Sequence, residues 1–169
     1  MSTALVVIDV QQSLVDEGPS QAEDLLEAIG HLVAAARAAQ AQVIYVKDRR
    51  VEPNGNLHSS LQPGPLEMTI EKDYCDAFLE TGLQQKLDQL GISKLVIAGM
   101  QTDYCIDTTC RSAAAHGYQV TLVSNAHSTF DDGDLPAKSI IAHHNRILHE
   151  FPAGRGSVSV AATDDVRFD

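Results

Sequence analysis

The sequence predicts a doubly wound α/β fold, with one six-stranded, mostly parallel β-sheet and helices on both of its faces. Short apolar runs rich in β-branched residues recur along the chain, as expected for strands that are covered on both faces. Segments with apolar residues at helical spacing lie between these runs. Strand and helix patterns therefore alternate, and right-handed crossovers then place helices on both sides of a parallel sheet.

The individual elements follow from five strong apolar runs and one weaker run. The strong runs span residues 3–9, 43–48, 95–99, 120–124 and 158–162, and the weaker run spans residues 68–71. Helical spacing covers residues 22–39, 78–90, 103–116 and 135–148, and each segment ends near a glycine or a polar break. Residues 49–67 hold three prolines and two glycines and are too long for a plain connection, so we expect a functional lid or a subunit contact there.

Length and charge bound the class of protein. At 169 residues the chain fits one domain, which we place over residues 1–169. Lysines and arginines number 12 against 23 aspartates and glutamates, which gives a formal net charge of −11. Such an acidic surface repels phosphate backbones, so we expect no nucleic-acid partner. The apolar stretches fall short of the roughly 20 residues that a membrane-spanning helix needs, so we expect no membrane partner.

The cysteines and the first residues indicate the compartment. The chain begins without a basic segment, an apolar run and a small-residue cleavage site in succession. The three cysteines, Cys75, Cys105 and Cys110, are an odd number and match no CxxC or Cys/His metal spacing. We therefore expect a cytoplasmic protein whose thiols are free.

The residues that follow the strands are the candidates for chemistry, because ligands of open parallel sheets bind beyond the carboxyl ends of the strands. The first two strong runs end on Asp9 and Asp48, and Lys72 follows the weaker run. The run over residues 95–99 is followed by a polar segment that contains Cys105. The sequence thus predicts an acid, a base and a thiol at one edge of the sheet.

Cys105 is the strongest candidate for a nucleophile. Thr102 can cap the predicted helix, which places Cys105 in its first turn, where the helix dipole favours a thiolate and free N–H groups can hold an oxyanion. The alternative is a small buried side chain packed on the sheet, the role that we assign to Cys110. Taken alone, Asp9 would be a turn cap and Lys72 a solvated side chain. Their convergence with a thiol favours covalent hydrolysis of a carbonyl compound.

These motifs resemble the isochorismatase-like cysteine hydrolases. The resemblance rests on Asp9-x-Gln11 after the first strand, on Lys72 with Phe78 six residues later, and on Gly99-x-x-Thr102-Asp103-x-Cys105. Residues 127–130 and 140–145 also fit, so the resemblance covers nearly the whole chain. It implies a three-layer Rossmann-like fold with a six-stranded sheet.

The resemblance further implies an Asp/Lys/Cys triad that hydrolyses a small amide-like C–N bond through a covalent thioester. Cys105 would attack the carbonyl carbon, and Asp9 would take the thiol proton and later pass it to the leaving amine. Lys72 would hold Asp9 and favour the anionic states. The backbone N–H groups of Gln101 and Cys105 would form the oxyanion hole, after a cis peptide bond between Met100 and Gln101.

Contacts with the small-molecule substrate are less defined than the triad. Gln11, Tyr104 and His127 are the residues that we expect to contact it. Arg49 and Arg50 are weaker candidates, because exposed arginine side chains are usually solvated. Specificity depends on loop shapes that the sequence does not encode in a recognisable pattern.

Two departures from the family pattern narrow the reaction. Nicotinamidases of this family carry a metal site with an Asp-x-His motif after the second strand, whereas this chain reads Asp48-Arg49-Arg50. A transition-metal site needs three or more ligands in one geometry, so we expect no metal and no other cofactor. Family members that hydrolyse the vinyl ether of isochorismate typically lack the cysteine, so Cys105 favours C–N hydrolysis, with the vinyl ether as an alternative.

A hypothesis from another class is a thiol-based redox or ligand-binding protein on the same fold. Its basis is the expected low pKa of Cys105 and the neighbouring Cys75, which lies three residues after Lys72. The 49–67 segment and the habit of the family also lead us to expect a homodimer or homotetramer.

Overall fold

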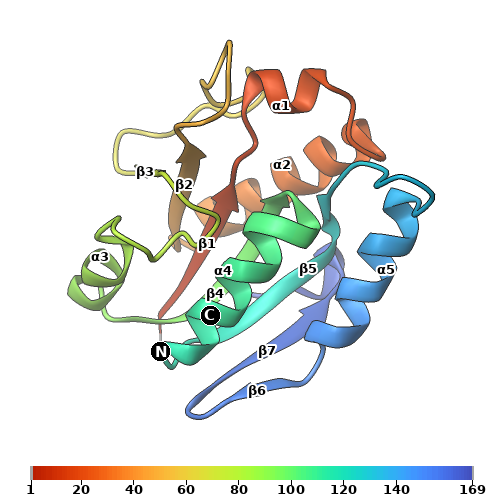
Figure 1. Cartoon of the computed structure of the whole chain (residues 1–169). Coiled ribbons are helices and arrows are strands. Elements are labelled where there is room, and N and C mark those ends of the chain that lie inside the picture. Colours follow the sequence, from red (N-terminus) through yellow and green to blue (C-terminus); the bar gives the residue numbers. More distant parts are fainter. Residues whose placement is uncertain (1, 169) are drawn as a thin grey trace.

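The computed structural model describes residues 2–168, which form a seven-stranded sheet in the order β3-β2-β1-β4-β5-β7-β6 (Figure 1). The strands are β1 (Ser2–Ile8), β2 (Gln42–Asp48), β3 (Met68–Lys72), β4 (Ile92–Met100), β5 (Gln119–Ser128), β6 (Phe151–Ala153) and β7 (Gly156–Ala161). All neighbouring pairs are parallel except β6 with β7. The chain runs outward from β1 to β3 and then returns to β4 on the other side of β1, which makes the β1/β4 boundary the topological switch point.

The α/β class is confirmed, and the predicted count of six strands is one too low. The missed strand is β6, three residues that pair antiparallel with β7 through a turn at Gly154, whose φ is +68°. Three residues are too few for a periodic pattern, and Pro152 within them weakens any strand signal.

Helices cover the two faces of the sheet (Figure 1). The helices are α1 (Gln12–Asp16), α2 (Ala22–Ala38), α3 (Leu83–Gln89), α4 (Asp107–Ala115) and α5 (Ala137–Leu148). Side chains alternate along each strand, so Val6 and Ile8 pack in a core with α3, α4 and α5. Leu5 and Val7 point the other way and pack in a second core with α2. Each strand of the centre is therefore buried on both faces, which explains its unbroken apolar sequence.

The helix predictions needed three corrections. The helix predicted over residues 78–90 begins only at Leu83, after Gly82 with φ +73°. The helix predicted over residues 103–116 consists of a π-turn, Thr102–Ile106, followed by α4. The short helix α1 was not predicted, because five residues do not establish a period.

Gly99 allows β1 and β4 to meet closely at the switch point. Its φ is +122°, a conformation that residues with a Cβ rarely adopt. A Cβ at this position would overlap the carbonyl oxygen of Ile8. The absent side chain thus brings the end of β4 directly beside Asp9, the residue that follows β1.

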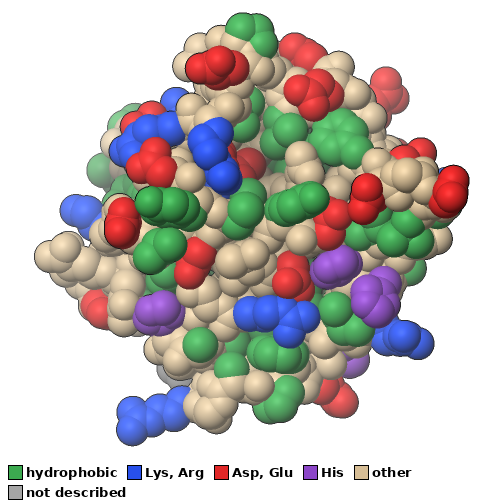
Figure 2. Space-filling view, in the orientation of Figure 1, with side chains coloured by type: hydrophobic (Ala, Val, Ile, Leu, Met, Phe, Trp, Pro, Cys, Tyr) green, Lys and Arg blue, Asp and Glu red, His purple; other side chains and the backbone are tan. Residues whose placement is uncertain are grey.

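The surface carries the acidic character of the composition. Figure 2 shows acidic side chains spread over the face in view, with basic side chains at fewer places, in keeping with the net charge of −11. Within residues 2–168 no helix combines the length and the apolar character that crossing a membrane requires.

Candidate active site

Asp9, Lys72 and Cys105 come together at the carboxyl edge of the sheet. The ammonium Nζ of Lys72 lies 2.8 Å from Oδ2 of Asp9 and 3.2 Å from Sγ of Cys105. The side chains of Lys72 and Asp9 are 0% and 2% exposed, so water hardly reaches the pair. The three residues that the sequence singled out from separate strand ends therefore form one cluster.

Each of these side chains is delivered by the end of a different strand. Asp9 follows β1 with a φ of 52°, a left-handed conformation that aspartate tolerates, and its N–H donates to the carbonyl of Val46 at 2.9 Å. Lys72 is the last residue of β3, and Cys105 lies in the π-turn that follows β4. The N–H of Ile106 donates to the carbonyl of Gln101 at 3.0 Å, which closes the wide turn.

The predicted cap of this helix is wrong. Thr102 caps no helix terminus, and its buried hydroxyl instead bonds Nδ1 of His127 at 2.8 Å. Cys105 is thus a buried residue of a π-turn and does not lie in the first turn of an α-helix. π-turns of this kind recur at functional sites.

Burial sets the protonation of the cluster. Loss of hydration raises the pKa of Asp9 to about 6, against the opposing effect of Lys72. Burial and the charge of Asp9 also raise the pKa of the Cys105 thiol, with Lys72 opposing them, so the predicted low thiol pKa is wrong. Burial disfavours the charge of Lys72, but Asp9 and Cys105 outweigh it and raise its pKa. At neutral pH the cluster therefore holds a carboxylate, an ammonium and a neutral thiol.

Asp48 is a second carboxylate in contact with Lys72, and the candidate triad did not include it. Its Oδ2 lies 2.9 Å from Nζ of Lys72 and 2.6 Å from Nη2 of Arg50. Burial opposes the charge of Asp48, but the hydrogen bonds from Arg50 and Lys72 prevail and hold its pKa well below the usual range. In the sequence, the indication that Asp48 joins the cluster was its position at the end of a buried strand, next to two other strand ends.

A cavity of about 450 Å³ opens directly onto the cluster. Asp9, Asp48 and Cys105 lie in its wall, together with Leu14, Arg50, Val51, Cys75, Gln101 and Tyr104. Leu14 and Val51 give it apolar character, and no pattern in the sequence marked either of them. A space of this size suits a small molecule.

The residue before Gln101 is joined to it as the resemblance implied. The peptide bond between Met100 and Gln101 is cis, and Gln101 lines the cavity beside Cys105. Within residues 2–168 the N–H of Gln101 donates to no backbone acceptor. Oδ1 of Asp9 is likewise buried without a hydrogen-bond partner in that part of the chain. In the described part of the chain, an unpaired donor and an unpaired acceptor thus belong to two residues that line the cavity.

Two of the three expected substrate contacts lie elsewhere. The amide of Gln11 is occupied by backbone: Nε2 donates to the carbonyls of Asp48 and Gly55, and Oε1 accepts from the N–H of Asp48. Gln11 thus fastens the loop after β2 and does not line the cavity. Tyr104 does line it and is 56% exposed.

His127 lies behind the π-turn, in the wall of a different cavity. The amide of Asn145 donates to the carbonyl of Ser124, so its oxygen faces Nε2 of His127, which must carry the proton. Nδ1 then accepts from the hydroxyl of Thr102, and burial lowers the pKa of His127 to about 4. The imidazole is therefore neutral and supports the segment that carries Cys105.

The same cluster presents three ligand-type atoms, from Asp9, Asp48 and Cys105, within 4.8 Å of one another. Lys72 is bound to all three residues, at 2.8, 2.9 and 3.2 Å. The place that a cation would take among them is filled by the ammonium itself. Arg50, in turn, stands where the Asp-x-His motif of nicotinamidases has its histidine, and it donates to Asp48. The residues present therefore fit an ammonium and a guanidinium, and not a metal ion.

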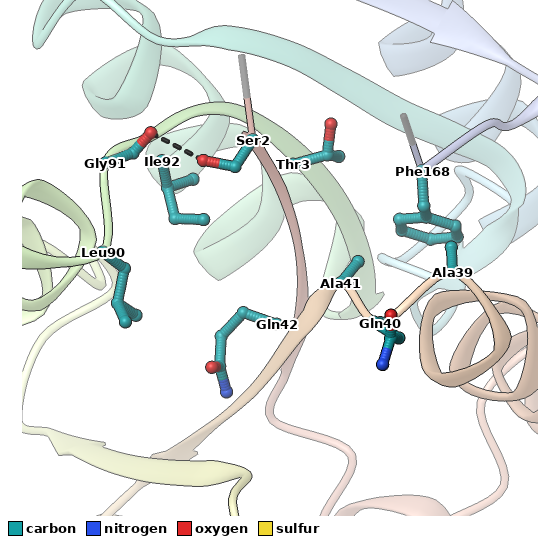
Figure 3. Close-up of a pocket in the computed structure, with 10 residues that line it drawn as sticks. All are labelled: Ser2, Thr3, Ala39, Gln40, Ala41, Gln42, Leu90, Gly91, Ile92 and Phe168. Carbon is teal, nitrogen blue, oxygen red and sulfur yellow. Dashed lines mark hydrogen bonds between the residues drawn. The ribbon is translucent and has the colours of Figure 1, made fainter.

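A larger cavity, of about 780 Å³, lies at the opposite edge of the sheet (Figure 3). Its wall includes Ser2, whose hydroxyl donates to the carbonyl of Gly91 at 2.7 Å, and the side chains of Gln42, Leu90 and Phe168. Among the described residues that line it, none carries an acid, a base or a thiol. The site is therefore identified by its side chains and not by its size.

One family model and several known proteins match this chain. Residues 3–142 match the model of the isochorismatase domain. The chain is 34% identical over 138 residues to a streptothricin hydrolase from Streptomyces noursei, a match that covers 76% of this chain and 50% of that protein. The chain thus spans about half the length of that relative. It is also 26% identical over 152 residues to nicotinamidase 3 from Arabidopsis thaliana, covering 76% of this chain and 74% of that protein.

Solved structures agree with the sequence comparison. The crystal structure of an isochorismatase from Pseudomonas putida KT2440 superposes with a TM-score of 0.88 at 26% identity. The superposition covers 98% of this chain and 90% of that one.

Proposed function

We propose that this chain, which belongs to the isochorismatase family of hydrolases, cleaves a small amide-like C–N bond with Cys105 as its nucleophile. Asp9 accepts and returns the proton, and Lys72 stabilises the carboxylate of Asp9 and the developing thiolate of Cys105. The observation that supports this most strongly is the ammonium of Lys72, which contacts both the carboxylate of Asp9 and the sulfur of Cys105 at the wall of one cavity.

The first half of the reaction forms a thioester. Asp9, ionised at neutral pH, takes the proton of the Cys105 thiol as the sulfur attacks the carbonyl carbon. The carbonyl oxygen becomes an oxyanion that the backbone N–H groups of Gln101 and Cys105 stabilise. The C–N bond then breaks, and the proton on Asp9 leaves with the amine.

The second half of the reaction restores the thiol. Water enters from the cavity and gives a proton to Asp9 as its oxygen attacks the thioester carbon. The C–S bond breaks, the acid product leaves, and Asp9 returns the proton to the sulfur of Cys105. Lys72 stays charged throughout and favours the carboxylate of Asp9 and the developing thiolate.

Three features support an amide as the substrate class. The thiol is the nucleophile that acyl transfer needs, and a cysteine departs from the pattern of vinyl-ether hydrolases. Two similar proteins carry the names streptothricin hydrolase and nicotinamidase. The cavity of about 450 Å³ has apolar side chains beside a few polar groups, which suits a small uncharged amide.

A panel of small primary and secondary amides tests the proposal by release of ammonia or amine. We expect turnover of at least one amide by the native chain and its loss in Cys105→Ala, with the far-UV circular dichroism unchanged. Cys110→Ala is the matched control, since Cys110 is a buried core residue of α4 outside the cavity. Hydrolysis retained by Cys105→Ala, or no turnover of any amide with turnover of a vinyl ether instead, would contradict the proposal.

A further inference from the structure

We propose that Asp48 and Arg50 are positioning residues of the catalytic cluster: Asp48 fixes the ammonium of Lys72, and Arg50 cancels the charge that Asp48 brings. This inference deepens the proposed function and rests on it for the catalytic role of Lys72. It extends the cluster from three residues to five, and it gives the sequence Asp48-Arg49-Arg50 a role of its own.

Asp48 completes the coordination of the lysine. An ammonium has three hydrogens to donate, and Lys72 has three acceptors: Oδ2 of Asp9, Oδ2 of Asp48 and Sγ of Cys105. Because these acceptors come from the ends of β1 and β2 and from the π-turn after β4, the ammonium is fixed in the middle of the cluster. With Asp48 absent, one hydrogen of a fully buried ammonium would lack an acceptor.

Arg50 holds Asp48 from the solvent side. Its Nε donates to Oδ1 of Asp48 at 2.9 Å, its Nη2 donates to Oδ2 at 2.6 Å, and its backbone N–H donates to Oδ1 at 2.9 Å. This is a two-pronged guanidinium–carboxylate pair, the strong and directional form of such a contact. The carboxylate is 7% exposed and the guanidinium side chain 56% exposed, so Arg50 covers Asp48 at the wall of the cavity.

The charges of the five groups balance. Two carboxylates, Asp9 and Asp48, face two cations, Lys72 and Arg50, and the thiol of Cys105 is neutral. Removal of Arg50 would leave one excess negative charge among buried groups. Removal of the charge on Asp48 would leave one excess positive charge. A negative charge raises the pKa of nearby acids and a positive charge lowers it, so the two changes act on Cys105 in opposite directions.

The charged groups that act on Asp9 and Cys105 come from the ends of neighbouring strands. Asp9 is affected by Lys72 at the end of β3, by Asp48 at the end of β2 and by Cys105. Burial raises the pKa of Cys105 most, and among the charged groups Asp9 raises it and Lys72 lowers it. Arg50 acts through its contact with Asp48, and its Nη2 also lies 3.9 Å from Sγ of Cys75.

The test is the pH dependence of iodoacetamide alkylation at Cys105, read by peptide mass spectrometry, because it needs no substrate. We expect Arg50→Gln to move the midpoint upward by about one pH unit and Asp48→Asn to move it downward by about one unit. The double variant restores the balance, and its midpoint returns toward that of the native chain. Asp48 stays ionised in Arg50→Gln over this range, because Lys72 still contacts it.

Arg49→Gln is the matched control. Arg49 directly precedes Arg50 in the chain, but it bonds Glu71 and Asp73 on the surface and does not line the cavity. Its substitution should leave the midpoint in place. Arg50→Lys keeps the charge but loses the two-pronged bond, and we expect a shift smaller than that of Arg50→Gln.

Shifts of the same sign in Arg50→Gln and Asp48→Asn, or a double variant whose midpoint stays at that of either single variant, would overturn the inference. If Asp48→Asn fails to fold, Arg50→Gln alone tests the inference, because Arg50 is exposed. An unchanged alkylation midpoint in Arg50→Gln would contradict the charge balance. Failure of the proposed function has a different signature. Opposite shifts in a chain that hydrolyses no amide would retain the inference and reject the activity.

Discussion

The two edges of the sheet differ in what their cavities contain. The cavity at the amino edge has about 780 Å³, and the one at the carboxyl edge about 450 Å³. The described residues that line the larger cavity are small, polar uncharged or apolar. The smaller cavity is lined by two carboxylates, a guanidinium and two thiols, and a buried ammonium lies behind it.

This difference follows from the topology and not from cavity size. Parallel strands end at the same edge, so the residues at or just beyond the ends of β1, β2, β3 and β4 converge there. The switch point between β1 and β4 opens a crevice, and Asp9 and Cys105 enter it from its two sides. The amino edge receives the ends of helices and the starts of strands, such as Ala39 and Gln42, which bring no reactive groups. The contrast leads to four predictions.

Lys72→Met should have the largest effect, because it leaves two buried carboxylates without their shared cation. We expect a loss of turnover of at least about 100-fold, the usual weight of a group that assists proton transfer. The free energy of unfolding at pH 7 should fall by about 3–5 kcal/mol, the cost of breaking a buried ion pair on one side. Urea unfolding measures this change.

Lys47→Met is the control for that variant. Lys47 lies 3.6 Å from Glu71, with side chains 22% and 48% exposed, so its loss should cost less than about 1 kcal/mol. Equal stability of the Lys72 and Lys47 variants would show that the buried cluster does not depend on its ammonium.

Acid should inactivate the catalytic cluster at the carboxyl edge. The pKa of Asp9 lies near 6, and its carboxylate must be ionised to accept the thiol proton. We therefore expect kcat/KM to fall about tenfold for each pH unit below about 6. A rate profile that stays flat down to pH 4 would exclude Asp9 as the base.

Asp9→Asn should remove the loss of stability that the folded protein undergoes when the buried carboxyl of Asp9 ionises. The folded-state pKa of Asp9 is raised from 3.8 to about 6, so its stabilising effect is fully present below about pH 4 and is lost as the pH rises through 6. Relative to the native chain, Asp9→Asn should gain about 2 kcal/mol between pH 4 and pH 7.5, because the carboxyl of the unfolded chain is already partly ionised at pH 4. Asp48 acts in the opposite sense, since its lowered pKa gives stability that is lost as the pH falls below about 4.

Urea midpoints of Asp9→Asn and the native chain, measured from pH 4 to pH 7.5, check this prediction. A constant difference between the two proteins across that range would mean that Asp9 has an ordinary pKa in the folded state. The carboxyl edge would then lack the carboxylate of raised pKa that distinguishes it.

Changes at the amino edge should have the smallest effect. Gln42 lines the larger cavity, and its side-chain amide donates to the backbone carbonyls of Val43 and Leu66. Gln42→Ala should leave kcat/KM within about twofold of the native value, as expected for a surface substitution. A loss comparable to that of Lys72→Met would place chemistry or a conformational link at that edge.

The strand ends were the part of the site that the sequence could reveal. Asp9, Lys72 and Cys105 each follow or end an apolar run, and parallel pairing is enough to bring such residues to one edge. The motif around Cys105 also implied the cis bond between Met100 and Gln101, which the structure contains.

The details of hydrogen bonding lay beyond the sequence. The π-turn that holds Cys105 differs from an α-helical turn by one residue in the hydrogen-bond register, and composition does not separate the two. Burial of the thiol, which reverses the expected direction of its pKa, depends on packing by several distant segments. The amide of Gln11 could face substrate or backbone, and only the fold of the loop after β2 decides this.

The partition of a thioester between water and hydroxylamine tests the central mechanism most directly. Amides that share an acyl group but differ in the amine should give one ratio of hydroxamate to acid, because all of them form the same thioester on Cys105. The peptide that contains Cys105 should also carry the mass of that acyl group after acid quench. Ratios that change with the amine, together with no adduct on Cys105, would contradict nucleophilic catalysis by this thiol.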